Sequence, residues 1–353
     1  MMDFFNSQKK NIELLLKEFF SKKQSSFREI NKWGGDVLKR LYSFTSAGKM
    51  IRGGLVVLFF RLYSKGNVDD ALRAGAAMEL FQSAFLIHDD IMDRDNMRRG
   101  KPSFFYQYGL LGERNAFSDP IHFGESMGIC AGDLSFFLGF EMLSSMKANP
   151  EIVRRAIDMC TEEIGFVTIA QMQDVYFGNL KESPEEKDIL KLYLYKTGRY
   201  TFSLPMKLGA LLAGRDEEIL AKIERIGNLL GIIFQIKDDE IGLFGEESEI
   251  GKPVGSDIKE NKKSFYLYYL EKSASTRQRT RLKNILTSGK VSVKDISFIR
   301  DMILELEINK KINSKMNEMI SQSRTLIEEL PVSYPEYRGI LEGLLDYSLN
   351  RNK

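Results

Sequence analysis

Histidine and cysteine are scarce in this 353-residue chain. The histidines are His88 and His122, and the cysteines are Cys130 and Cys160. Zinc sites and histidine–aspartate metal hydrolases need more of these ligands than the chain provides. Two cysteines form no disulfide framework, which agrees with a reducing compartment. The sequence also lacks a GxxxxGK[ST] loop, so a nucleotide-binding P-loop is excluded.

Excess charge and long apolar runs are lacking as well. The net charge is +2, so no global basic field points to nucleic acid or to an anionic membrane surface. No run approaches the roughly twenty apolar residues that a membrane span needs. The first residues do not have the order of a secretory signal. We therefore expect a cytoplasmic protein that binds no nucleic acid and has no stable membrane span.

Strand signals are also weak, and helical periodicity dominates. There are eight prolines, and no run alternates convincingly as a strand. Apolar residues cover nearly the whole circumference over 71–91, as in a buried helix, and recur at helical spacing over 219–236. Ser183-Pro184 predicts a helix start, with the serine as N-cap. Loops are expected at 96–126, 243–262 and 271–295. We predict an all-α fold with one domain over residues 1–353.

A cluster of acids follows the first apolar helix, in "LIHDDIMDRDNMRRGKP". Asp89 and Asp93 are four residues apart, so a helix places them one turn apart on one face, with Asp90 beside them. Three neighbouring carboxylates repel each other unless a cation lies among them. Mg²⁺ prefers oxygen ligands and keeps waters and phosphates in its shell. A solvated helix end is the other reading of this motif.

A second acidic pair changes the balance between these readings. Asp238 and Asp239 in "FQIKDDEIG" again follow a buried apolar helix. Two such clusters that face each other can hold several Mg²⁺ ions around one diphosphate. His88 is most simply a buried neighbour of the first cluster.

Cationic side chains are numerous around these acids. Arginine makes bidentate, charge-assisted contacts with phosphate, and glycines allow close backbone approach. Taken singly, each cation is more simply interpreted as a surface lysine or arginine. Together these cations exceed the number that one diphosphate needs. They suggest two anionic substrates, one held through metal ions and one by basic side chains alone. The cations are Lys49, Arg52, Arg98, Arg99, Lys101, Lys196 and Lys252.

The motifs "DDIMD", "RRGKP", "KTG", "FQIKDD" and "GKPVGSD" together resemble the short-chain trans-isoprenyl diphosphate synthases. Their order and spacing match along about residues 45–265. The resemblance implies a large antiparallel helical bundle around a deep central cavity, the isoprenoid synthase type I fold, and a homodimer. It implies head-to-tail condensation of isopentenyl diphosphate with dimethylallyl, geranyl or farnesyl diphosphate. The expected cofactor is Mg²⁺, with three ions when the allylic diphosphate is bound.

The resemblance also implies a role for each residue that matches a motif. Metal binding falls to Asp89, Asp90, Asp93, Asp238 and Asp239. The allylic diphosphate and the developing carbocation are matched by Arg98, Lys196, Thr197, Gln235 and Lys252. Isopentenyl diphosphate is matched by Lys49, Arg52, Gln82 and Arg99. Gln171 and Asp174 resemble a cavity-lining element, and Asp257 and Lys262 resemble a closing loop.

The chain departs from the family pattern at several positions. "AGKMIRGG" stands where "GGKRLRP" is usual, but the lysine and the arginine are kept. Gly242 replaces a third aspartate of the second acidic motif, which removes one possible ligand or water contact. We expect this loss to be tolerated, because Asp238 begins the motif. Ala170 and Asn261 each replace a glycine.

The resemblance also implies that a bulky residue one to three turns before Asp89 forms a floor that limits product length. Ala84 opens the first level, and Phe81 or Phe85 closes the next, although both phenylalanines also read simply as core residues. We expect geranylgeranyl diphosphate as the product, with farnesyl diphosphate next. The alternatives are a class I terpene cyclase, which needs no second diphosphate site, and a non-catalytic subunit that modulates a partner synthase.

Overall fold

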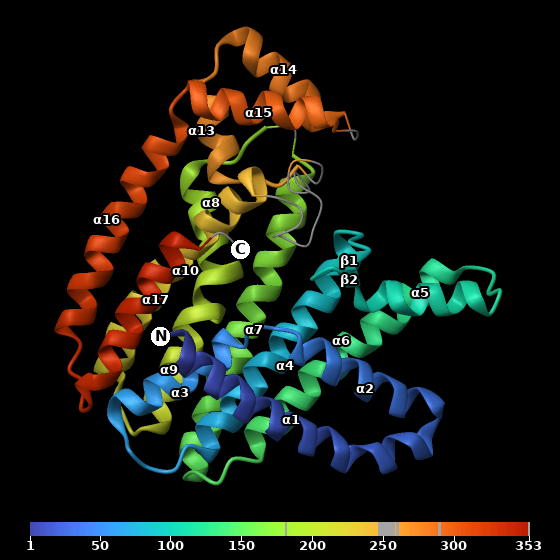
Figure 1. Ribbon diagram of the computed structural model, residues 1–353, viewed down its shortest axis with the longest axis vertical. Helices are drawn as coiled ribbons and strands as arrows, with labels where there is room; N and C mark the ends of the chain where they lie inside the picture. Colours follow the sequence, from blue (N-terminus) through green and yellow to red (C-terminus); the bar gives the residue numbers. More distant parts are fainter. Residues whose placement is uncertain (181, 246–257, 259–260, 289–290, 352–353) are drawn as a thin grey trace. The chain divides into compact units, whose positions relative to one another are not determined.

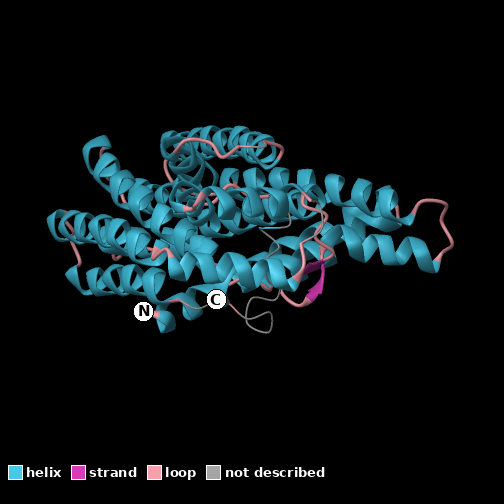
Figure 2. Cartoon of the chain, turned by 90° about the horizontal axis from the view of Figure 1, so that it is seen from above, coloured by secondary structure: helices cyan, strands magenta, loops and turns pink. Residues whose placement is uncertain are grey.

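The computed structural model describes residues 1–180, 182–245, 258, 261–288 and 291–351. Nearly all of these residues are helical, as Figure 2 shows, so the expected all-α class is confirmed. Within the described part of the chain, the strands are β1 (Met97–Arg98) and β2 (Lys101–Pro102), which pair antiparallel.

The chain divides into two compact units, which are described separately. Unit 1 comprises Met1–Thr161, Pro205–Leu220 and Pro331–Ile340, and unit 2 comprises Glu162–Leu204, Ala221–Leu330 and Leu341–Lys353. Two long helices, α7 (Pro150–Gly178) and α10 (Glu217–Phe244), contribute residues to both units. A single domain over residues 1–353 stays a prediction.

Unit 1 is built around α4 (Asp69–Met92). The middle of this helix, Ala74–Phe81, is buried on every side, as the all-round apolar pattern of 71–91 predicts. Its neighbours α3 and α6 pack against it, and they too carry few charges. The other helices of this unit are α1 (Met2–Ile30), α2 (Lys32–Ser46), α3 (Ile51–Tyr63), α5 (Phe104–Arg114), α6 (Pro120–Ser144), α9 (Leu204–Leu212) and the short η2 (Pro335–Tyr337).

The predicted loop over 96–126 is wrong for most of its length. It contains the β1–β2 hairpin, helix α5 and the first turns of α6 (Figure 1). Glycines and prolines suggested a loop here. The glycines of α5 and α6 instead lie at a close contact, because a Cβ on Gly124 would lie 2.5 Å from the carbonyl oxygen of Phe105.

Unit 2 holds the second half of α7, most of α10 and the helices near the other end of the chain. In Figure 1, α16 runs alongside α17 within this unit. The remaining elements are α8 (Glu186–Tyr193), the π-helix η1 (Leu194–Ser203), α13 (Phe265–Ser273), α14 (Thr276–Thr287), α15 (Val293–Glu305), α16 (Ile308–Glu329) and α17 (Arg338–Asn350).

Two sequence expectations for unit 2 need correction. The stretch 271–295 is largely helix α14 and not a loop, because a serine capping box at Ser275 starts a helix with a polar surface. The N-cap position of helix α8 is Glu185 and not Ser183, and the Glu185 side chain makes no capping hydrogen bond. Most of the predicted loop 243–262 lies outside the described residues.

Helix α6 is long and apolar enough to cross a membrane by length and composition alone. The sequence estimate of apolar runs missed this helix. The core helix of a protein that spans no membrane meets the same test, and α6 packs against the buried helix α4.

Candidate functional site

The C-terminal end of α4 presents Asp89 and Asp93 one turn apart, as predicted from their spacing. The Asp93 backbone N–H donates to the Asp89 carbonyl oxygen at 2.8 Å, so the helical geometry extends through Asp93. Both residues are partly exposed. Two carboxylates on one accessible face can bind a hard divalent cation together with substrate oxygens.

Asp90 behaves differently from its neighbours. Its side chain is 0% exposed, and its Oδ1 accepts a hydrogen bond from Arg98 Nε at 2.6 Å and forms an ion pair with Arg98 Nη2 at 2.5 Å. Burial would lower the pKa of Arg98, but hydrogen bonding and charge from Asp90, helped by Asp89 and Asp95, raise it above its usual value. Asp90 therefore holds a permanently charged guanidinium beside Asp89, whose Oδ2 lies 3.6 Å from Arg98 Nη2.

The hairpin turn places two arginines in sequence. Arg99 and Gly100 have φ angles of 53° and 70°, as the two central residues of a type I′ turn require. Gly100 adopts such angles without strain. Arg98 thus lies on the strand that faces Asp90, while Arg99 Nη1 donates to the Phe44 carbonyl oxygen at 3.2 Å.

A second cationic cluster surrounds Glu79, which the sequence analysis missed. Glu79 is buried on α4, and its Oε1 accepts a hydrogen bond from the Gly53 backbone N–H at 2.8 Å, at the start of α3. Burial raises the pKa of Glu79, although Arg52 and Arg99 act in the opposite direction. Burial, together with Arg98 and Arg52, lowers the pKa of Arg99. These charges therefore form one cluster. The only sign of it in the sequence was one acid, Glu79, in the apolar middle of this helix.

Two further predicted residues of unit 1 are near this cluster in the sequence. Gln82 lies one turn after Glu79 on α4, and its Oε1 is buried with no hydrogen-bond partner among the described residues. Lys49 is exposed between α2 and α3, three residues before Arg52. A buried acceptor such as Gln82 Oε1 normally has a hydrogen-bond partner, so its position suits a bound ligand or water.

The proposed floor residues lie on the α6 side of α4. Phe81 is fully buried, and its ring centroid is 5.0 Å from that of Phe140. A Cβ at Gly139 would meet the Phe81 ring at 2.4 Å, so the glycine makes room for this ring. Phe85 is partly buried, with its ring 5.0 Å from Phe136. Ala84 is fully buried.

In unit 2, a hydrogen-bonded chain connects several predicted residues. Thr197 Oγ1 donates to Gln235 Oε1 at 2.7 Å, and Gln235 Nε2 donates to Asp239 Oδ1 at 3.0 Å. The Tyr193 hydroxyl donates to Asp239 Oδ2 and accepts from the Phe265 backbone N–H at 2.9 Å. Asp239 is buried, so these contacts satisfy its carboxylate. Tyr193 was not predicted, because nothing in the sequence connects it with Asp239.

The π-helix η1 presents Lys196 and Thr197. Lys196 Nζ pairs with the Asp174 carboxylate on α7. Arg199 anchors the same helix through Glu163, at 3.0 Å from Nε, and Glu224, at 2.6 Å from Nη1. Burial would lower the pKa of Arg199, but both glutamates raise it. π-Helical segments often occur at functional sites, and here one carries two predicted substrate contacts.

Asp238 is the accessible member of the second acidic pair. Its side chain is 57% exposed, and its Oδ1 accepts a hydrogen bond from Arg351 Nη2 at 2.6 Å. Helix α10 continues to Phe244, so this pair lies inside the helix and not at its end as predicted.

The closing-loop residues are described in part. Asn261, which replaces a glycine of the family pattern, has φ 53°, a left-handed angle that asparagine tolerates. Its Nδ2 donates to the Gly178 carbonyl oxygen at 2.9 Å, which tethers the segment to the end of α7. Lys262 is partly buried. Lys252 and Asp257 lie outside the described residues.

The described residues contain no group of three or more histidine, cysteine, aspartate or glutamate side chains placed to hold a metal ion by themselves. Mg²⁺ is commonly held by one or two carboxylates plus phosphates and waters. Asp89 and Asp93 in unit 1, and Asp238 in unit 2, supply suitable oxygens. That the two acidic clusters face each other stays a prediction.

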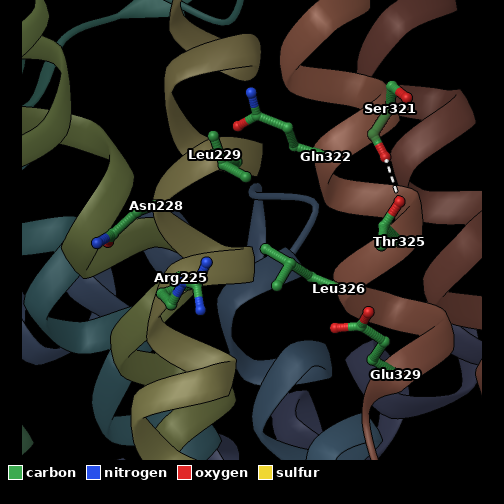
Figure 3. Close-up of a pocket in the computed structure, with 8 residues that line it drawn as sticks. All are labelled: Arg225, Asn228, Leu229, Ser321, Gln322, Thr325, Leu326 and Glu329. Atoms are coloured by element: carbon green, nitrogen blue, oxygen red, sulfur yellow. Dashed lines mark hydrogen bonds between the residues drawn. The ribbon is translucent and has the colours of Figure 1, made fainter.

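A separate cavity of about 570 Å³ lies in unit 2 (Figure 3). It is open, and side chains of α10 and α16 line it. None of the predicted site residues lines it. The lining residues are Arg225, Asn228, Leu229, Ser321, Gln322, Thr325, Leu326 and Glu329.

Comparison with known proteins gives consistent matches. The sequence matches the polyprenyl synthetase family over residues 37–303. A short chain isoprenyl diphosphate synthase from Methanocaldococcus jannaschii is 35% identical over 253 residues, which cover 71% of this chain and 70% of that protein. A geranylgeranyl diphosphate synthase from Saccharolobus solfataricus is 27% identical, with coverage of 99% and 98%.

The fold also matches a solved structure. A geranylgeranyl pyrophosphate synthase from Corynebacterium glutamicum, complexed with isoprenyl diphosphate and magnesium, superposes with a TM-score of 0.91. It is 27% identical, and the match covers 98% of both chains. The isoprenoid synthase type I fold expected from the motifs is therefore confirmed.

Proposed function

Because the chain belongs to the polyprenyl synthetase family and is a trans-prenyltransferase, we propose that it condenses isopentenyl diphosphate head to tail with an allylic diphosphate. The observation that carries this proposal is the presence of two kinds of charged site in unit 1. One combines accessible carboxylates with Arg98, and the other places Arg52 and Arg99 around Glu79. A class I terpene cyclase has no use for the second site.

The donor atoms suit Mg²⁺ at the first site. Asp89 and Asp93 would supply carboxylate oxygens there, and Asp238 would supply one at the second acidic pair. Three bound ions would stabilise the negative charge of the departing diphosphate. Asp90 and Asp239, also expected as ligands, are buried against Arg98 and against Gln235 and Tyr193. Their proposed role is to hold these neighbours in place.

The reaction begins when the allylic C–O bond breaks and its electron pair goes to the diphosphate. Arg98 and Lys252 bind the diphosphate oxygens where this charge develops. The allylic cation is stabilised by nearby oxygens, from the Thr197 hydroxyl, the Lys196 carbonyl and the Gln235 side chain. The bond from Gln235 to Asp239 fixes the amide orientation. Apolar walls exclude the water that would quench the cation.

Isopentenyl diphosphate then provides the nucleophile. Its alkene attacks the allylic carbon, and the resulting cation loses a proton, for which the released diphosphate is the proposed base. Lys49, Arg52 and Arg99 bind the diphosphate of this substrate without metal, and Gln82 Oε1 lies in the same region of α4. Lys262 belongs to a segment proposed to close over the substrates.

The proposed main product is geranylgeranyl diphosphate, with farnesyl diphosphate as the shorter candidate. The twenty-carbon product is supported first by similarity, because two of the similar proteins are geranylgeranyl diphosphate synthases. The packing of α4 supplies the second argument. Fully buried Phe81 lies one turn before Phe85, and both rings contact phenylalanines of α6. This packing supports the proposal that Phe81 forms the floor of the product channel.

We propose a homodimer, supported by apolar side chains that this chain leaves exposed. On α6 these include Ile129 and Phe137, which are 49% and 71% exposed. Large exposed apolar groups in one surface commonly mark an interface. Light scattering should give twice the mass of one chain, 40.5 kDa each, and Phe137→Glu should shift the mass toward one chain. A single-chain mass for the unmodified protein would contradict the proposal.

Product analysis tests the function. The protein is incubated with Mg²⁺, labelled isopentenyl diphosphate and dimethylallyl, geranyl or farnesyl diphosphate in turn, and the alcohols are separated by length after hydrolysis. A dominant twenty-carbon product is expected, and Asp89→Asn should abolish it. If folded protein incorporates no label with any primer, the synthase proposal is wrong, and a cyclase or a non-catalytic subunit takes its place.

A further inference from the structure

Arg351 follows helix α17 and reaches back to the second acidic pair. Its side chain is only 6% exposed. The guanidinium carbon lies 3.6 Å from the centroid of the Phe234 ring, and Nη2 donates to the Phe234 carbonyl oxygen at 3.2 Å. The same Nη2 donates to Asp238 Oδ1 at 2.6 Å. All three residues belong to unit 2.

This pair differs from an ordinary surface ion pair. Asp238 is 57% exposed, whereas Arg351 is held by stacking and by a backbone carbonyl that do not involve Asp238. The cation is therefore fixed in advance, and the carboxylate meets it. Arginine suits this role because it is planar, always charged and stacks on aromatic rings.

We propose that Arg351 is a built-in counter-cation of the second acidic pair. It neutralises Asp238 when no divalent cation is bound, and its charge opposes the entry of a divalent cation at that carboxylate. A diphosphate brings the negative charge that offsets this opposition, so cation binding at Asp238 is coupled to binding of the allylic substrate. The inference rests on the proposed function, in which Asp238 is a metal ligand.

Binding of Mn²⁺ alone to the full chain tests the inference. Free Mn²⁺ is measured by electron paramagnetic resonance without diphosphate, and urea unfolding is measured in EDTA. Arg351→Gln should tighten Mn²⁺ binding about fivefold, an order of magnitude typical of a like charge removed near a partly exposed site. The same change should lower the urea midpoint, because the stacking of Arg351 on the Phe234 ring and its hydrogen bond to the Phe234 carbonyl oxygen are lost. If Arg351 has a purely structural role, Arg351→Gln lowers the urea midpoint but leaves the Mn²⁺ affinity unchanged or weaker. That result would overturn the proposal.

Two variants separate charge from packing. Arg351→Lys keeps the positive charge, so its Mn²⁺ affinity should stay near that of the unmodified protein even if its stability falls. Tighter binding in this variant would contradict the proposal. Arg324→Gln is the matched control, because Arg324 pairs with Asp346 of α17 at 2.8 Å without touching Asp238. It should leave Mn²⁺ binding unchanged.

A double-mutant cycle assigns the effect to Asp238. In an Asp238→Asn background, Arg351→Gln should no longer change Mn²⁺ affinity, while the first acidic cluster remains intact. An effect that persists in this background would refute the link with Asp238. The product assay on the unmodified protein stays independent. If the unmodified protein forms no product, the proposed function is wrong. If it forms product but Arg351→Gln does not combine tighter Mn²⁺ binding with a lower urea midpoint, only the role of Arg351 is wrong.

Discussion

The buried pair of Asp90 and Arg98 allows a quantitative test of how the first site is held together. Arg98→Met removes the guanidinium that pairs with the carboxylate of Asp90, which is 0% exposed, and the arginine itself is 13% exposed. Removing one member of a buried ion pair costs about 3–5 kcal/mol, because the other charge stays buried without compensation. We expect a loss of this size in the free energy of unfolding.

Urea unfolding in EDTA measures this loss without any contribution from metal. The slope of the transition should stay the same, so that the shift in midpoint reports stability alone. Asp90→Asn combined with Arg98→Met should cost less than the sum of the two single changes, with a coupling of about 1–3 kcal/mol. Arg154→Met is the control, because its partners Glu151 and Asp158 are exposed, and it should leave stability unchanged. If Arg98→Met loses less than about 1 kcal/mol, the reasoning about Asp90 is wrong.

The remaining predictions concern product length, pH and the second unit. Phe81→Ala should lengthen the product by at least one five-carbon unit in the product assay. It should also lower the free energy of unfolding by about 3–5 kcal/mol. Unchanged product lengths in both Phe81→Ala and Phe85→Ala would refute the role of these residues as the channel floor. Burial raises the pKa of Glu79 above 4.5 in the folded protein, so ionisation of Glu79 opposes folding. The unmodified protein should therefore lose stability relative to Glu79→Gln as pH rises above 4.5. A stability difference between the two proteins that stays constant from about pH 4 to pH 8 would contradict the raised pKa. Tyr193→Phe removes a donor to buried Asp239 and should lower stability by about 1–3 kcal/mol and slow turnover more than it changes substrate KM, while unchanged turnover would argue against the hydrogen-bonded chain.

Much of the first site was predictable because it depends on local spacing. Asp89 and Asp93 are one helical turn apart in any helix, and the all-round apolar pattern before them identified α4 as buried. The different role of Asp90 was not predictable in the same way. It depends on a hairpin turn at Arg99-Gly100 that directs Arg98 back to the helix.

The contacts that the sequence did not predict join residues far apart in the chain. Tyr193 meets Asp239, and Arg351 meets Asp238, only because separate helices pack together. Helix α14 was missed for a different reason, since its surface is too polar for an apolar pattern to reveal it. Glu79 was missed because a single buried acid has no partner pattern along its own helix.

The proposed function requires two diphosphate sites, one that binds through metal ions and one that binds through basic side chains alone. Calorimetric titration of isopentenyl diphosphate and of a non-reactive allylic diphosphate analogue, each with Mg²⁺ and with EDTA, tests this division most directly. We predict that isopentenyl diphosphate binds equally well in EDTA and is lost in Arg52→Gln, whereas the allylic analogue binds only with Mg²⁺. If isopentenyl diphosphate also requires Mg²⁺, or binds the Arg52→Gln variant unchanged, the metal-free basic site does not exist as described.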